Sequence, residues 1–154
     1  MKKILLSAVL AVSMIQSALA SDQELWGCHL ESGKMVMVTG LGQGDNPTLA
    51  IGDAPEPEEV YLIATPHNRV KFNYDRTDSG ELTYLRFTSG TIDYVVHETF
   101  GRGKTFVGIK LFENGKLFAD AYCTSAPVGI LTAPVSDVVE TESPENSIKF
   151  SVMH

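Results

Sequence analysis

The feature that most constrains this chain is a series of short β-type runs separated by hairpin turn signals. Asn114-Gly115 is a strong two-residue hairpin signal because both residues tolerate a positive φ. Ser89-Gly90 joins two further runs, and residues 77–80 make a longer connection. Closely spaced hairpins make successive strands antiparallel, since parallel neighbours need long crossovers. The runs predicted as strands are 34–39, 48–51, 60–64, 69–74, 81–88, 91–98, 104–112 and 116–123.

Each of these runs either has the two-residue period of a half-buried strand or is continuously apolar over a short length. In the run at 69–74, for example, Val70, Phe72 and Tyr74 alternate with polar residues, which predicts one buried and one wet face. No amphipathic helical stretch of useful length follows the first 20 residues. The predicted fold is therefore all-β, an antiparallel meander of about eight strands forming a small barrel or a sandwich.

The N-terminus has the three parts of a secretory signal peptide. Lys2 and Lys3 precede an apolar run at 4–15, and residues 18–20 form a small-x-small end. The run is too short to cross roughly 30 Å of hydrocarbon as a helix. We therefore expect residues 1–20 to be removed and the mature chain to be periplasmic or secreted, with no membrane span after cleavage.

Both cysteines, Cys28 and Cys123, lie in the expected mature chain. An even cysteine count in an oxidising compartment favours a disulfide over a metal or catalytic role. No Cys-x-x-Cys redox motif is present. The alternative is a pair of free buried thiols. Trp26 precedes Cys28 by two residues and is expected to pack over the disulfide rather than to stack on a ligand.

Two segments carry prolines and acidic residues in place of a clear strand pattern. Residues 42–59 read as an acidic loop around one short strand. Residues 127–154 read as an extended acidic tail of low order that can add one edge strand at 147–152. The predicted organisation is thus a disulfide-linked β-domain at 21–126 followed by this proline-containing tail.

The charge balance limits the kinds of partner. The net charge is −7, and nucleic acid is excluded because phosphate binding needs clustered Lys and Arg. An acidic exported chain is steered toward cationic partners, although negative charge also serves solubility alone. Arg102, Lys104, Lys110 and Lys116 nevertheless give the last hairpins a local positive charge.

The residues capable of covalent chemistry do not form a recognisable catalytic pattern. His97 and Glu98 are strand neighbours that face opposite sides, which predicts a half-exposed histidine rather than an oriented base. No Gly-x-Ser-x-Gly elbow surrounds Ser89 to support a triad with His97 and Asp93. The Gly-Arg-Gly-Lys sequence at 101–104 leads into a strand, unlike a phosphate loop. With no metal-ligand spacing among the histidines, we expect no enzyme, no metal and no cofactor.

Four short motifs point to one known family. Residues 26–28 have an aromatic-x-Cys sequence, and 89–94 form a Ser-Gly turn followed by a tyrosine, one residue later than in Ser-Gly-x-x-Tyr. Residues 103–104 are Gly-Lys, the reverse order of the Lys-Gly pair in the later turn of that family. Residues 122–123 form a closing Tyr-Cys. Over 88–123 in particular, the chain resembles the membrane-bound or periplasmic C-type lysozyme inhibitors.

This resemblance implies a single β-barrel without enzymatic activity. It also implies that a serine turn and a basic turn enter the lysozyme cleft and engage its catalytic carboxylates. In this chain Ser89, Tyr94 and Lys104 are the matching positions. With Arg102 they make the predicted contact edge of a protein-binding module whose partner is a cationic lysozyme.

Two other functions stay open. One is an envelope structural or assembly role through the acidic tail or an open sheet edge. The other is a small-molecule-binding barrel. Its cavity would be lined by Tyr61, Phe72, Tyr84 and Phe106.

Overall fold

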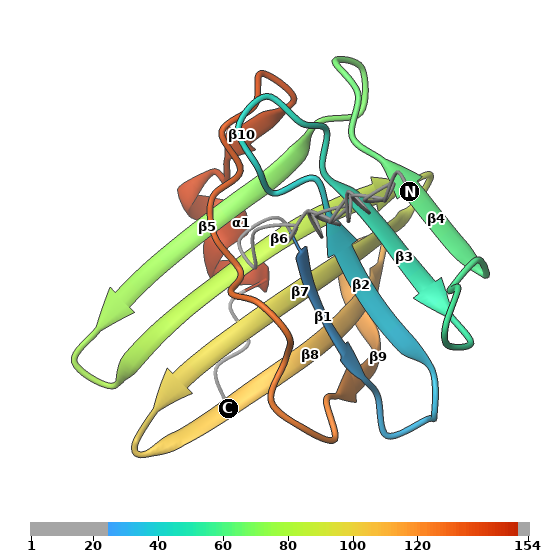
Figure 1. Cartoon of the computed structure of the whole chain (residues 1–154). Helices are drawn as coiled ribbons and strands as arrows, with labels where there is room; N and C mark the ends of the chain where they lie inside the picture. Colours follow the sequence, from blue (N-terminus) through green and yellow to red (C-terminus); the bar gives the residue numbers. More distant parts are fainter. Residues whose placement is uncertain (1–24, 151–154) are drawn as a thin grey trace, which may run out of the picture.

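A computed structural model describes residues 25–150, which form two β-sheets and one short helix (Figure 1). The predicted signal peptide lies outside the described residues. Strands β1 to β4 make a small sheet in the order β1-β2-β3-β4, and the large sheet has the order β10-β5-β6-β7-β8-β9. The elements are β1 (Leu25–His29), β2 (Met35–Thr39), β3 (Thr48–Gly52), β4 (Val60–Ile63), β5 (Val70–Thr77), β6 (Gly80–Ser89), β7 (Ile92–Gly101), β8 (Lys104–Glu113), β9 (Lys116–Tyr122), β10 (Val139–Thr141) and α1 (Pro144–Phe150).

The all-β prediction is confirmed, and the strands adopt a sandwich-like arrangement of two sheets rather than one closed barrel. The eight predicted strands correspond to β2 through β9, which are joined as an antiparallel meander within each sheet. The turn chemistry explains the long hairpins of the large sheet. Asn114 and Gly115 have φ values of 49° and 76°, the left-handed conformation that a tight hairpin turn requires.

The tail departs from the sequence prediction. The predicted edge strand at 147–152 is wrong over its described part, because Pro144–Phe150 is a helix. Pro144 suits a first helical position, and Ser143 Oγ accepts a hydrogen bond from the Asn146 amide at 3.3 Å. The tail instead contributes β10, which pairs in parallel with β5. Two apolar residues, Ile148 and Phe150, were too few to distinguish a strand from a short helix.

The main core fills the space between the two sheets. Trp26, Val38 and Leu49 from the small sheet and Leu85 and Val96 from the large sheet are buried in one cluster. The alternation within these strands directs each of these side chains inward. Apolar burial between the sheets is therefore the main term that stabilises the fold.

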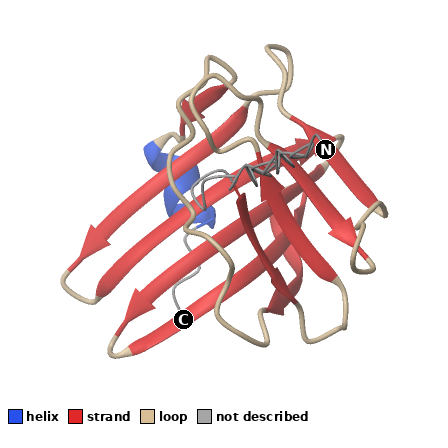
Figure 2. Cartoon of the chain, viewed as in Figure 1, coloured by secondary structure: helices blue, strands red, loops and turns tan. Residues whose placement is uncertain are grey.

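Helix α1 packs on the opposite side of the large sheet, which we call its outer face (Figure 2). There Phe150 joins Leu82, Tyr84, Val95 and Phe112 in a second buried cluster. The large sheet is thus covered on both faces over part of its area.

The predicted burial of Tyr74 is wrong. Tyr74 is 52% exposed, whereas its neighbour Asn73 is only 8% exposed. The β5–β6 hairpin extends past the small sheet, so the inward face at Tyr74 has no cover (Figure 1). Asn73 lies opposite Tyr84 on the outer face, which carries the second cluster.

Candidate functional site

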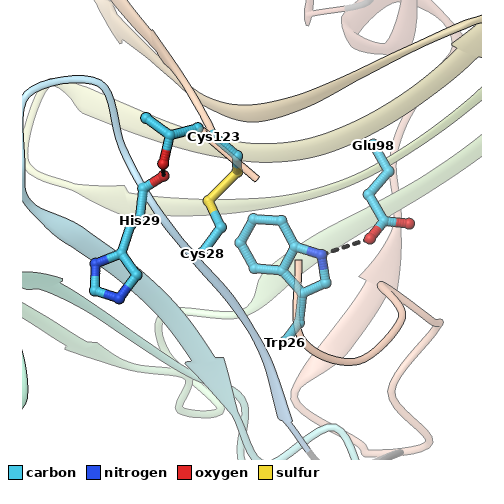
Figure 3. The surroundings of a disulfide bond; sticks show 6 residues. Trp26, Cys28, His29, Glu98 and Cys123 are labelled. Atoms are coloured by element: carbon cyan, nitrogen blue, oxygen red, sulfur yellow. Dashed lines mark hydrogen bonds between the residues drawn. A yellow bond between two sulfur atoms is a disulfide. The ribbon is translucent and has the colours of Figure 1, made fainter. Parts of the chain in front are cut away.

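The predicted disulfide between Cys28 and Cys123 is present and joins β1 to the residue after β9 (Figure 3). The two Cα atoms are 5.7 Å apart, within the usual range for a disulfide. Trp26 is fully buried beside this bond, and its Nε1–H donates a hydrogen bond to Glu98 Oε1 at 2.5 Å. Its ring therefore serves the core and offers no exposed surface for a ligand.

Glu98 and His97 point to opposite faces of β7, as their adjacent positions predict. Glu98 faces the core, where burial raises the pKa of its carboxyl while the Trp26 hydrogen bond opposes that rise. His97 was expected to be half exposed, and that prediction is wrong, because it is 4% exposed on the outer face. The sequence pattern identifies the face of a residue but not what covers that face.

The structure does not bring the four predicted contact residues together. Ser89 ends β6, whereas Arg102 lies in the turn at the other end of the ten-residue strand β7 and Lys104 directly follows that turn. At about 3.3 Å per residue, the two turns lie roughly 30 Å apart. Tyr94 is half-buried and packs against the main core. The expectation of one contact edge formed by all four residues is therefore not met.

Arg102 and Lys104 instead belong to a surface that we call the hairpin end: Tyr74, Phe100, Arg102, Lys104 and Phe106. The register pairs Gly80 with Gly101, so the β5–β6 and β7–β8 turns are neighbours. Both hairpins extend beyond the small sheet (Figure 1). Tyr74, Phe100 and Phe106 are 52%, 49% and 44% exposed. The register places Tyr74 and Phe100 on the core-facing side of the large sheet and Phe106 on its outer face, so exposed aromatic side chains flank the basic turn on both faces.

Fewer basic residues belong to this surface than the sequence suggested. Lys110 lies in the middle of β8 and is buried, and burial lowers the pKa of its ammonium group. Lys116 begins β9, next to the β8–β9 turn and away from the hairpin end. Arg102 and Lys104 are therefore the basic residues of the β7–β8 turn, where Arg102 has a φ of 50°.

A second set of polar side chains, not found from the sequence, crosses the outer face in one row. The strand register aligns Asn73, Tyr84, His97, Gly108 and Tyr122 across β5 to β9. Directly opposite residues in such a sheet have Cβ atoms about 5 Å apart. Among residues 25–150, Asn73 Nδ2, Tyr84 OH and His97 Nε2 are buried side-chain atoms without a hydrogen-bond partner.

Electrostatics keep two members of this row neutral near pH 7. Burial lowers the pKa of His97 to about 4, and the positive charge of Lys110 adds to that effect. Burial raises the pKa of the Tyr84 hydroxyl, and the negative charge of Glu142 adds to it. Both groups are therefore hydrogen-bonding groups without charge, held in a site closed to bulk water.

Arg86 lies two residues after Tyr84 in β6 and on the same face of the sheet. It is a charged residue beside this row. Its Nε and Nη2 donate to the two carboxylate oxygens of Glu142 at 2.6 and 2.9 Å. Its Nη1 donates to Asp93 at 2.9 Å. A spacing of two residues in β6 places Tyr84 and Arg86 on one face, and this period is the sequence signal that could have identified the site.

The proposed lining of an internal cavity is not supported by the positions of its residues. Tyr61 is 61% exposed, Phe106 is at the hairpin end, and Tyr84 lies on the outer face. Phe72 does pack against the main core. Because these side chains lie in four different surroundings, they do not line one interior site.

Residues 25–150 contain no group of three or more His, Cys, Asp or Glu side chains placed to hold a metal ion. In the same part of the chain, no helix is long and apolar enough to cross a membrane. No protein-family model, curated protein or solved structure matches this chain. The arrangement of the described side chains is therefore the basis for any proposal about function.

Proposed function

We propose that this chain is an exported, non-enzymatic binding protein that inhibits a cationic glycoside hydrolase of the lysozyme type, using its hairpin end. The observation that carries the proposal is the placement of Arg102 and Lys104 on a projecting hairpin with an exposed aromatic side chain on each face, Phe100 on one and Phe106 on the other. Aromatic residues and arginine are enriched at the energetic centres of protein interfaces.

The shape of the hairpin end suits insertion into a cleft. The β7–β8 turn has two central residues, Arg102 and Gly103, both in the left-handed conformation. The ten-residue strands on either side are paired along their whole length. A turn held in this way loses little conformational entropy when it binds, so more of the contact energy appears as affinity.

The charge distribution supports two stages of association. The full chain has a net charge of −7, and loss of Lys2 and Lys3 with the expected signal peptide makes the mature chain −9, which attracts a cationic enzyme at long range. At short range, the two basic side chains at the turn can pair with the carboxylates in a glycosidase cleft. The Ser89 turn is at the opposite end of β7, so the same cleft cannot receive both turns.

The disulfide is compatible with the oxidising periplasm or extracellular space. Together with the signal-like N-terminus, it supports a partner outside the cytoplasm. A small hydrolase that acts on the cell envelope would be encountered there.

The test is an inhibition assay with the oxidised mature chain, residues 21–154, and lysozymes of the C, g and i types. We expect one type to be inhibited in a dose-dependent manner. The double substitution Arg102→Ala/Lys104→Ala should raise the half-inhibitory concentration at least about tenfold, corresponding to about 1.4 kcal/mol of binding free energy.

Lys116→Ala is the matched control, because it also removes an exposed basic residue beside a hairpin turn. Ser89→Ala tests the opposite end of β7. Both should inhibit like the unmodified protein. Full activity of all three lysozyme types at micromolar inhibitor would reject the function, and a loss confined to Ser89→Ala would reject the hairpin end as its contact.

A further inference from the structure

The outer face of the large sheet has the composition of a binding surface rather than of a solvent face. Leu82, Val95 and Phe112 form an apolar floor, and Tyr84 and Arg86 stand among them, all buried. An antiparallel sheet with one face on the core usually carries polar, solvated residues on the other. This face is instead covered by the chain's own C-terminal segment.

Phe150 shows what kind of group the face receives. Its ring packs edge-to-face on Phe112, with the centroids 4.8 Å apart. The guanidinium carbon of Arg86 lies 4.7 Å from the centroid of the same ring. An aromatic ring held between another ring and a cation is a specific mode of recognition.

Beyond the Glu142–Arg86 ion pair, the segment that supplies this ring is weakly attached. Helix α1 has seven residues, about two turns, and helices of that length are not stable alone. Within α1, Phe150 is the buried residue, whereas Ile148 is 78% exposed. A segment anchored by one apolar side chain is expected to open without global unfolding.

The covering segment also leaves some buried polar atoms of the outer face without hydrogen-bond partners. Asn73 Nδ2 and His97 Nε2 remain buried without hydrogen-bond partners, and the register places them on either side of Tyr84, whose hydroxyl lies close to the Glu142 carboxylate. Asn73 Nδ2 and the Tyr84 hydroxyl are donors that suit carbonyl oxygens. Buried polar groups without partners destabilise the state in which α1 covers the outer face.

From these contacts we propose that the outer face is a second interaction surface, which α1 occupies as a displaceable cover. Its partner is a peptide segment of another protein that presents an aromatic side chain. That ring takes the place of Phe150 between Phe112 and Arg86, and the carbonyl groups of the peptide accept hydrogen bonds from Asn73 and Tyr84. This surface is independent of the hairpin end and of any lysozyme.

A peptide with the sequence of residues 136–150, labelled with fluorescein, is the probe, because this sequence supplies the ring seen on the face. Its binding to the oxidised mature chain is measured by fluorescence anisotropy. In the Phe150→Ala variant the covering ring is missing, and we expect the probe to bind at least tenfold more tightly than to the unmodified chain.

Ile148→Ala is the matched control, since it truncates an exposed apolar side chain on the same helix. It should bind the probe like the unmodified chain. A second probe that carries alanine at the position of Phe150 should bind at least tenfold more weakly to the Phe150→Ala variant. Equal binding of the two probes, or of the two variants, would show that α1 is a structural cover only.

Hydrogen exchange on the unmodified chain keeps the proposal testable if Phe150→Ala does not fold. Amides of residues 147–150 should exchange at least a hundredfold faster than those in the centre of β6 and β7. Exchange at one common rate would mean that α1 opens only with the whole domain, and the proposal would fail.

Discussion

His97 lies on the outer face of β7, where it is 4% exposed and makes an edge-to-face contact with Tyr122. Burial is the larger cause of its lowered pKa, Lys110 adds to it, and Asp120 opposes it. The uncharged form is therefore the one that the fold accommodates. The unfolded chain has no such preference, so the folding equilibrium becomes linked to pH at this residue.

We expect the stability contributed by His97 to be present above pH 6.5 and to be lost as the pH falls toward about 4. The unfolded histidine gains a proton in this window while the folded one does not, which favours the unfolded chain. The difference in pKa corresponds to about 3 kcal/mol. Urea unfolding of the unmodified chain and of His97→Gln, each at pH 7 and pH 4, measures it.

The raised pKa of Glu98 makes its contribution to stability increase as the pH falls, the reverse of the His97 effect. The His97 effect is therefore the difference between the unmodified chain and His97→Gln in how much stability each loses from pH 7 to pH 4. His67→Gln is the control because His67 is exposed in the loop between β4 and β5. It should keep the pH dependence of the unmodified chain. The same pH dependence in His97→Gln would show that this residue is not its source.

Two glycines of the β7–β8 hairpin, one in its turn and one in β8, are limited in different ways. Gly103 has a φ of 74°, and a Cβ there would have no heavy atom within 4 Å. A Cβ on Gly108 would lie 2.1 Å from the carbonyl oxygen of Ala121 in β9. The first position is limited by backbone conformation, the second by the close approach of a neighbouring strand.

We expect Gly108→Ala to lower the free energy of unfolding by about 3 kcal/mol or more, because β9 must move away from β8. Gly103→Ala should cost only about 1 kcal/mol, the penalty of a left-handed alanine. Urea unfolding curves of both variants provide the comparison. A larger loss for Gly103→Ala would contradict this assignment of the two glycines.

At the scale of the whole molecule, the Cys28–Cys123 bond closes a long loop. The two residues are 95 positions apart, and the loop includes both sheets up to the end of β9. In the chain-entropy description, closing a loop of this size in the unfolded chain stabilises the folded state by about 4–5 kcal/mol.

We expect the double variant Cys28→Ser/Cys123→Ser to lose about 4–5 kcal/mol of unfolding free energy. The measurement is guanidinium unfolding of the oxidised chain, the reduced chain and the double variant. Reduced and substituted proteins should agree. An unchanged free energy after reduction would mean that the disulfide contributes little to stability.

Local sequence determined the strands and their turns. Asn114 and Gly115 fix a hairpin by their own conformational preferences, and the two-residue periods assign the faces of β5 and β8. The cysteine pair was predictable from count and compartment, and the structure confirms it. These properties depend on a residue and its near neighbours, so no distant contact was needed to infer them.

Tertiary structure alone decided which faces are covered and which turns are neighbours. His97 is buried beside Tyr122 of β9, and Tyr74 is exposed because the small sheet stops short of the hairpin end. The Ser89 and Arg102 turns lie at opposite ends of β7 because the meander alternates its direction. The physical reason is that burial and proximity depend on segments far apart in the chain, which the pattern within a strand does not record.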